Sequence, residues 1–203
     1  MNRPILVVED IPNIREMLEI TLRFKGYEVV SAADGEEALE IIKTSLPSLV
    51  ITDILMPRMD GFTFIHTLRQ DPRTRPLPVI VLSATYTTPE DKHFAMSLGA
   101  VRFLEKPIDT EEFLLTVAET LTGETPTMPI PMDDFKFYLE YRSRLENKLG
   151  HKNSQITRME RLVQVLPESQ KAAFQSLLAD AIRDRDEIQQ QLDDIYRRSR
   201  KND

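Results

Sequence analysis

The sequence predicts an α/β protein: a five-stranded, doubly wound parallel sheet, followed by an all-α helical hairpin. Two observations lead to this fold class. In residues 1–122, short β-branched runs alternate with segments of helical period, whereas residues 135–203 keep only the helical period. Strands that alternate with helices form parallel sheets covered by helices on both faces. We therefore expect two parts of different architecture.

The expected strands are apolar enough to be buried on both faces of a sheet. They are PILVVE (4–9), YEVVSA (27–32), LVIT (49–52), LPVIVLS (77–83) and VRFL (101–104). Between them, apolar residues recur every three or four positions, as in Ile14, Leu18 and Leu22. These segments are the expected helices.

Capping residues agree with this assignment. Asp34 and Asp109 each stand three residues before a glutamate, which is typical of the start of a helix. Gly26 and Gly99 stand where the preceding helices should end.

A proline-rich stretch separates the two parts. The segment TGETPTMPIPMDD contains Pro126, Pro129 and Pro131, and its composition predicts a semi-extended linker. We accordingly expect a domain at 1–122, a linker at 123–134 and a helical hairpin at 135–203.

The hairpin is predicted from two heptad series separated by Pro167. The first contains Phe135, Tyr138, Leu145, Leu149, Ile156, Met159, Val163 and Leu166, and the second contains Phe174, Leu178, Ala181, Ile188, Leu192 and Ile195. Two helices of about thirty residues, each ~45 Å long, would leave much of both stripes exposed. We therefore expect a homodimer in which two hairpins form a four-helix bundle through residues 135–203. Three cations on the seam, Arg142, Lys152 and Arg185, would favour one register of that bundle.

Composition limits the classes of function. The chain has no cysteine, which excludes disulfides and thiolate chemistry. Residues 1–123 carry 12 Lys/Arg against 19 Asp/Glu, and residues 124–203 carry 14 against 14, so neither part has the basic surface typical of nucleic-acid binding. The first apolar run is too short for a signal peptide or a membrane span. We expect a cytoplasmic protein with no membrane contact.

Polar residues gather at the carboxyl ends of the predicted strands. They are Glu9, Asp10, Asp53, Ser83 and Lys106, and Pro107 follows Lys106. In a doubly wound sheet these ends open on one edge, where ligands bind. The sequence therefore brings three carboxylates, one hydroxyl and one ammonium to a single crevice.

Three neighbouring carboxylates repel one another, which favours a bound divalent cation such as Mg²⁺. The charges of the acids, the ion and Lys106 would then sum to zero. This arrangement suits an incoming phosphoryl group, whose oxygens the metal, Lys106 and Ser83 can contact while a carboxylate attacks. Asp53 is the expected nucleophile.

The motifs ILVVED, ITDILMPRMDG, IVLSA and FLEKP occur in this order across residues 1–122. In these residues the chain resembles the receiver domain of bacterial two-component response regulators, which has a flavodoxin-like fold with strand order 2-1-3-4-5. The resemblance implies that Asp53 accepts phosphate from a sensor histidine kinase or a phosphotransfer protein. It implies a signalling protein that catalyses only its own phosphorylation and dephosphorylation.

The resemblance also assigns roles around Asp53. Glu9, Asp10, Asp53 and the backbone carbonyl of Leu55 would hold Mg²⁺. Lys106 would contact the phosphoryl group, with a cis peptide bond at Pro107. Ser83 and Phe103 would act as switch residues that change the surface around the fourth helix, fifth strand and fifth helix.

Three outputs are left open. The first is a regulator that switches protein–protein interaction through its helical dimer. The second is a phosphorelay intermediate that passes phosphate to His151, which lies off the heptad seam; the alternative for His151 is an ordinary surface histidine. The third is a DNA-binding transcriptional regulator using Arg197, Arg198, Arg200 and Lys201, whose alternative role is to favour a helix dipole. We interpret His66 and His93 as structural.

Overall fold

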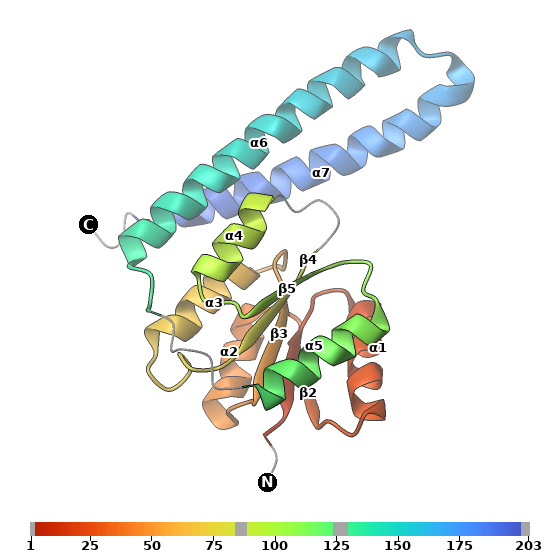
Figure 1. The fold of residues 1–203 in the computed structure, drawn as a ribbon. Helices are drawn as coiled ribbons and strands as arrows, with labels where there is room; N and C mark the ends of the chain where they lie inside the picture. The colour runs from red at the N-terminus through yellow and green to blue at the C-terminus, as the bar shows by residue number, and fades with distance from the viewer. Residues whose placement is uncertain (1–2, 84–88, 124–129, 200–203) are drawn as a thin grey trace. The chain divides into compact units, whose positions relative to one another are not determined.

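The fold class predicted from the sequence is confirmed. The computed structural model describes residues 3–83, 89–123 and 130–199, and its sheet has five parallel strands in the order β2-β1-β3-β4-β5 (Figure 1). The strands are β1 (Ile5–Val8), β2 (Val29–Ala32), β3 (Leu49–Asp53), β4 (Val79–Ser83) and β5 (Arg102–Glu105). Every residue of β1, β3 and β4 is buried, as expected for the centre of a sheet covered on both faces.

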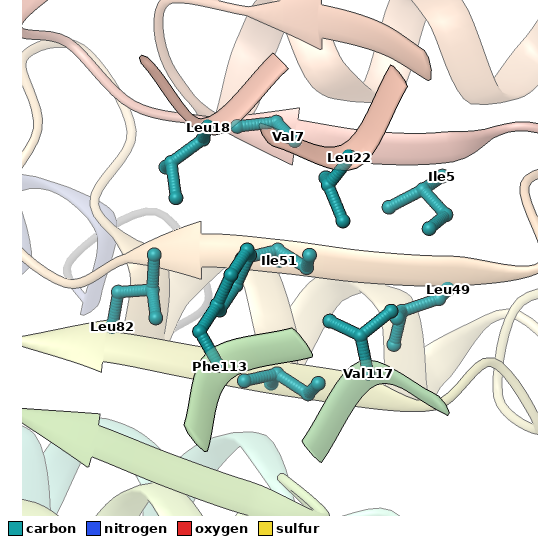
Figure 2. Close-up of a cluster of buried hydrophobic side chains, with 10 residues drawn as sticks. Ile5, Val7, Leu18, Leu22, Leu49, Ile51, Leu82, Phe113 and Val117 are labelled. Carbon is teal, nitrogen blue, oxygen red and sulfur yellow. The ribbon is translucent and has the colours of Figure 1, made fainter. Parts of the chain in front are cut away.

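Five helices accompany the strands. They are α1 (Pro12–Phe24), α2 (Gly35–Thr44), α3 (Gly61–Gln70), α4 (Pro89–Ser97) and α5 (Thr110–Thr122). Helices α1 and α5 cover one face of the sheet, where Leu18, Leu22, Phe113 and Val117 pack on side chains of β1, β3 and β4 (Figure 2). On the other face, α2 packs against β1, β2 and α3, and the rings of Phe62 in α3 and Phe94 in α4 lie 5.1 Å apart.

Short polar side chains start several of these helices. The Asp34 carboxylate accepts hydrogen bonds from the amides of Glu36 and Glu37, and the Asp109 carboxylate accepts one from Glu112, so both predicted caps are confirmed. Gly26 and Gly99 follow α1 and α4 with φ angles of 87° and 94°, a conformation that favours glycine.

The chain divides into two compact units, Met1–Met132 and Asp133–Asp203. The second unit is a pair of long helices, α6 (Asp134–Val165) and α7 (Glu168–Ser199), each of 32 residues. They pack against each other along their length, and only Leu166 and Pro167 separate them (Figure 1). The predicted hairpin is thus present.

The seam of the hairpin differs from the heptad prediction at its start. Phe135 is 77% exposed, whereas Phe137 and Tyr141 are buried and their rings lie 5.6 Å apart. From Leu145 onward the predicted seam holds, because Leu145 and Ile156 are buried. Both series have helical period, so the pattern alone could not choose between the neighbouring aromatics of FKFY.

The three seam cations find partners inside one hairpin. The Lys152 ammonium lies 2.9 Å from the Asp184 carboxylate, which joins α6 to α7. Arg185 pairs with its neighbour Asp186 at 2.6 Å. Arg142 lies 3.6 Å from the Glu146 carboxylate, which in turn accepts a hydrogen bond from the Tyr196 hydroxyl. Of these contacts, the Lys152–Asp184 ion pair and the Tyr196–Glu146 hydrogen bond join α6 to α7.

Candidate functional site

Four strand ends meet at one edge of the sheet. Strand β1 is followed directly by Glu9 and Asp10, β3 ends on Asp53, and β4 ends on Ser83. Because β3 and β4 pair Asp53 with Leu82, and β4 and β5 pair Ser83 with Glu105, these ends are level with one another. Lys106 follows β5 at the same level, and its amide donates a hydrogen bond of 2.6 Å to the Ser83 carbonyl.

Lys106 bridges two of the carboxylates. Its ammonium lies 2.6 Å from Asp53 Oδ2 and 2.7 Å from Glu9 Oε2. The Glu9 side chain is fully buried, and those of Asp53 and Lys106 are only 7% and 13% exposed. The other oxygen of Asp53 accepts a hydrogen bond of 2.5 Å from the Ile54 amide. Charged groups this close in a desolvated site interact strongly.

Asp10 completes an acidic cluster. Glu9, Asp10 and Asp53 each offer a carboxylate oxygen, and these three oxygens lie within 4.8 Å of one another. Burial raises the pKa of Glu9, and repulsion from Asp53 adds to that rise, while Lys106 opposes it. Burial and repulsion from Asp53 likewise raise the pKa of Asp10. One ammonium therefore does not fully compensate three carboxylates.

The same carboxylates shift the pKa of Lys106. Burial lowers its pKa, but the attraction and hydrogen bonds from Asp53 and Glu9 outweigh burial, so the pKa is raised overall. Lys106 is thus held as a cation beside Asp53 at neutral pH. The peptide bond between Lys106 and Pro107 is cis.

The loop after β3 folds back against the end of that strand through a hydrogen bond that the sequence did not predict. The Gly61 amide donates a hydrogen bond of 2.8 Å to the Ile54 carbonyl. A Cβ atom on Gly61 would lie 2.1 Å from the Asp53 carbonyl oxygen, so only glycine fits there. Asp60 caps α3 through the amides of Phe62 and Thr63. The Asp-Gly pair was the available signal, and it marked a turn but not this close approach.

A second tie joins this loop to α2. Arg58 has a φ of 60°, and its guanidinium forms an ion pair with the buried carboxylate of Asp34. The Gly35 amide donates a hydrogen bond of 3.1 Å to the Met59 carbonyl. Neither contact could be read from the sequence, because both depend on how the loop after β3 folds back onto α2.

The remaining predicted site residues lie around this edge. Ser83 is buried at the end of β4, and Phe103 is half-buried in β5. Leu55 is 50% exposed, two residues after Asp53.

The histidines and the basic tail lie elsewhere in the fold. His66 is buried in α3, and His93 is exposed on α4. His151 is exposed on α6. In the basic tail, Arg197 pairs with Asp194 at 2.6 Å, while the side chain of Arg198, together with Arg200 and Lys201, lies outside the described residues.

Residues 5–118 match the family model described as the response regulator receiver domain. The chain belongs to this family. The receiver therefore takes part in two-component signalling, as the motifs predicted.

Similar proteins agree with this membership. The chain is 34% identical over 150 residues to response regulator Rre1 of Synechocystis, covering 72% of this chain and 64% of that protein. It is 37% identical over 117 residues to RpaA of Synechocystis, described as a DNA-binding dual master transcriptional regulator, covering 58% of this chain and 48% of that one. The chain thus spans about half the length of this regulator.

Solved structures show the same receiver fold. The chemotaxis response regulator CheY4 of Vibrio cholerae has 36% sequence identity and a TM-score of 0.55, and the match covers 60% of this chain and all of that one. A protein of Chloroflexus aurantiacus, described as a response regulator, has 38% identity and a TM-score of 0.58, and the match covers 61% of this chain and all of that one. In the part of the chain that the structure describes, no helix is both long and apolar enough to cross a membrane.

Proposed function

We propose that the receiver accepts a phosphoryl group on Asp53 and thereby controls protein–protein interaction through its helical hairpin. The observation that supports this is the Lys106 bridge between Asp53 and Glu9, with Asp10 beside it. A buried carboxylate next to a fixed ammonium can act as a nucleophile toward a phosphorus atom whose oxygens the ammonium neutralises.

In the proposed reaction, an Asp53 oxygen forms a bond to phosphorus as the bond from phosphorus to a histidine nitrogen of the donor breaks. The imidazole leaves with the electrons of that bond and takes up a proton. Lys106 orients the incoming group, and the Ile54 amide holds one Asp53 oxygen in place. The donor would be a sensor histidine kinase or a phosphotransfer protein.

The acidic cluster fits a magnesium ion. Three carboxylate oxygens within 4.8 Å, with raised pKa values at Glu9 and Asp10, form a site that a hard divalent cation would stabilise. Glu9, Asp10, Asp53 and the Leu55 carbonyl would hold it. When bound, the ion would neutralise phosphoryl oxygens during transfer. Ser83 and Phe103 would respond to the new charge, with Pro107 shaping the Lys106 loop.

Phosphorylation by a small phosphodonor tests the acceptor. Incubation with acetyl phosphate and Mg²⁺ should add one hydroxylamine-labile phosphate to the wild type and none to Asp53→Asn, as read on a phosphate-affinity gel. Asp71→Asn changes an exposed aspartate outside the site and should be labelled like the wild type. Label retained in Asp53→Asn would contradict the proposal. Phosphate found on the hairpin but absent from His151→Gln would instead support relay through His151.

The hairpin offers a surface for a second copy of the chain. Among the described residues of the hairpin, the buried ones lie in 137–156 and 181–195, and in the fully described segment 157–180 no residue is buried. That segment exposes Leu162 (38%), Val165 (79%) and Leu177 (50%) on both helices. One hairpin cannot bury these side chains, whereas two can.

Charge favours a second copy as the occupant. Residues 157–180 contain three Lys/Arg and three Asp/Glu, so two such segments do not repel each other. In each copy, residues 1–123 together carry a net charge of −7, which disfavours pairing through the receivers alone. We accordingly propose a homodimer through residues 135–203, with its main contact around Leu177.

Light scattering with and without Mg²⁺ and beryllofluoride, a mimic of the phosphoryl group, tests the dimer. The wild type should have about twice the 23.5 kDa chain mass in both states. Leu177→Glu should weaken the dimer by about tenfold or more, because a charge would be buried in the contact. Gln190→Glu adds the same charge at an exposed site of α7 outside the segment and should leave the mass unchanged. A monomeric wild type, or equal effects of both variants, would contradict the proposal.

A further inference from the structure

The end of the receiver is held by helix α3. The side-chain amide nitrogen of Gln70, the last residue of α3, donates a hydrogen bond of 2.9 Å to the Met132 carbonyl, 62 residues further along the chain. Met132 is the last residue of the first compact unit. The next residue, Asp133, is the N-cap of α6, and its side chain accepts a hydrogen bond from the Lys136 amide. The contact therefore holds the chain two residues before α6 begins at Asp134.

His66 supports the Gln70 side chain. The His66 ring is one turn earlier on α3 and only 5% exposed, and its Nε2 lies 3.4 Å from the Gln70 amide nitrogen. With Nε2 as an acceptor, the two hydrogens of the amide nitrogen can serve His66 and Met132 together. A buried ring thus limits the rotation of an exposed side chain, which makes the bond to Met132 better defined.

The other end of α3 touches the acceptor. The amide of Gly61, the first residue of α3, donates a hydrogen bond to the Ile54 carbonyl, and Gly61 packs directly against the Asp53 backbone. Eight of the ten residues of α3 are buried, so the helix packs in the core as one rigid element about 15 Å long. The Asp53 loop and Met132 therefore contact opposite ends of the same helix.

We infer that Gln70 is a positioning residue that connects the phosphoacceptor loop, through α3, to the start of α6. The inference rests on the proposed role of Asp53 and adds a route to the hairpin. This route differs from the surface of α4, β5 and α5 that the family resemblance implies. In the route, the phosphorylation state shifts α3, and Gln70 passes the shift to the backbone at Met132.

The first test measures the hydrogen bond itself. The chain has no cysteine, so Ile130→Cys, at a side chain that is 91% exposed, gives a single site for a nitroxide label. Gln70→Met keeps the side-chain length but removes the donor, and it should increase label mobility in the spin-resonance spectrum. Gln70→Lys supplies a new donor and should restore the wild-type spectrum. Gln155→Met, at an exposed glutamine of α6, is the control. An unchanged spectrum in Gln70→Met would overturn the inference.

The second test measures transmission. Labels at Glu16→Cys on α1 and Asn147→Cys on α6, both exposed positions, report the distance between receiver and hairpin. Beryllofluoride with Mg²⁺ should change this distance in the wild type, and Gln70→Met should reduce the change by about half or more. Gln70→Lys should recover it, which a merely structural defect would not allow.

The outcomes separate the inference from the function on which it rests. Binding of beryllofluoride is followed independently by its fluorine resonance. If Gln70→Met binds the mimic and keeps the full distance change, the route through Gln70 is wrong while the proposed function stands. If the wild type binds the mimic without any distance change, the route is also wrong. If the wild type does not bind the mimic, the proposed function itself fails, and the signalling part of the inference fails with it.

Discussion

At the level of single residues, Gly61 lies so close to the backbone of Asp53 and Ile54 that no side chain fits there. A methyl group there would lie 2.1 Å from the Asp53 carbonyl oxygen and 3.0 Å from the Ile54 Cα, both backbone atoms that cannot rotate away. Gly61→Ala should therefore lower the free energy of unfolding by about 2–3 kcal/mol, as overpacking does in well-packed regions. Urea denaturation followed by circular dichroism measures this loss.

Gly150 is the matched control. It lies in the middle of α6, and a Cβ atom there would meet nothing within 4 Å. Gly150→Ala should raise the free energy of unfolding by about 0.5–1 kcal/mol, because alanine loses less backbone entropy in a helix. Opposite signs are thus expected from the same chemical change, and a loss of similar size at both positions would contradict the explanation.

Asp10 has a pKa that gives stability a defined pH dependence. Because burial and Asp53 raise the folded-state pKa above the ordinary value of 3.8, the folded protein binds this proton more tightly than the unfolded chain. The contribution of Asp10 to the free energy of unfolding is most favourable below the unfolded-state pKa. It is lost as the pH rises through the folded-state pKa. The penalty therefore grows as the pH rises from the unfolded-state pKa toward the folded-state pKa.

Asp10→Asn should remove that penalty. Without Mg²⁺ at neutral pH, the variant should be more stable than the wild type by about 1 kcal/mol, and the difference should shrink as the pH falls toward 4. Mg²⁺ should stabilise the wild type more than the variant, because the ion binds the folded state through this carboxylate. Glu16→Gln, an exposed acid of α1, controls for net charge. Thermal unfolding at several pH values measures these differences, and a variant that is less stable at neutral pH would refute the explanation.

The sequence predicted the charged members of the site because strand ends reveal them. Glu9, Asp53 and Lys106 each follow an apolar run, and parallel strands bring such ends together regardless of loop structure. Gly61 and Arg58 were not identified, since their importance depends on how closely the loop returns to β3 and α2. That approach is set by three-dimensional packing and leaves no period in the sequence.

At the level of whole elements, Arg69 joins α3 to the end of α4. Its guanidinium is almost completely buried and donates hydrogen bonds of 2.8 Å to the Gly99 carbonyl and 3.0 Å to the Arg75 carbonyl. Burial lowers its pKa to about 10, which still leaves the group charged at neutral pH. Gly99 ends α4 in a left-handed conformation, so this contact fixes the position of that helix end.

Arg69→Met should weaken the contact between α3 and the end of α4 and so destabilise the protein. Methionine fills similar space but leaves two partly buried carbonyls without their donors, which should cost about 2–3 kcal/mol in the free energy of unfolding. Arg73→Met, at an exposed position nearby, should change the free energy by less than about 0.5 kcal/mol. Urea denaturation of both variants gives the comparison, and equal free energies would show that the buried contact contributes little.

Helices α6 and α7 show which features the apolar periodicity of a sequence can predict and which it cannot. Apolar periodicity predicted the existence, type and approximate length of α6 and α7, because 32-residue amphipathic segments leave a strong signal. It placed Phe135 on the seam instead of Phe137 and Tyr141, since both choices keep a helical period up to Leu145. The partner helix makes that choice through packing, and a single-helix pattern does not contain the partner.

At the level of the whole molecule, the two compact units should unfold under separate control. The proposed functions give them different ligands: Mg²⁺ and the phosphoryl mimic for Met1–Met132, and a second copy of the chain for Asp133–Asp203. A ligand stabilises only the unit that binds it, and dimerisation makes a transition depend on protein concentration. Each transition is therefore identified by what shifts it.

Scanning calorimetry of the full chain with Mg²⁺, at two protein concentrations and with or without beryllofluoride, measures both dependences. The mimic at about 100 times its Kd should raise the receiver transition by about 10 °C, since such binding contributes about 2.7 kcal/mol and a unit of this size has an entropy of unfolding of about 0.28 kcal/mol per degree. Higher protein concentration should raise only the hairpin transition. Asp53→Asn should abolish the first shift, and Leu177→Glu should abolish the second. A single transition that responds to both would mean that the units unfold together, so that phosphorylation and dimerisation must be coupled in energy and not only in geometry.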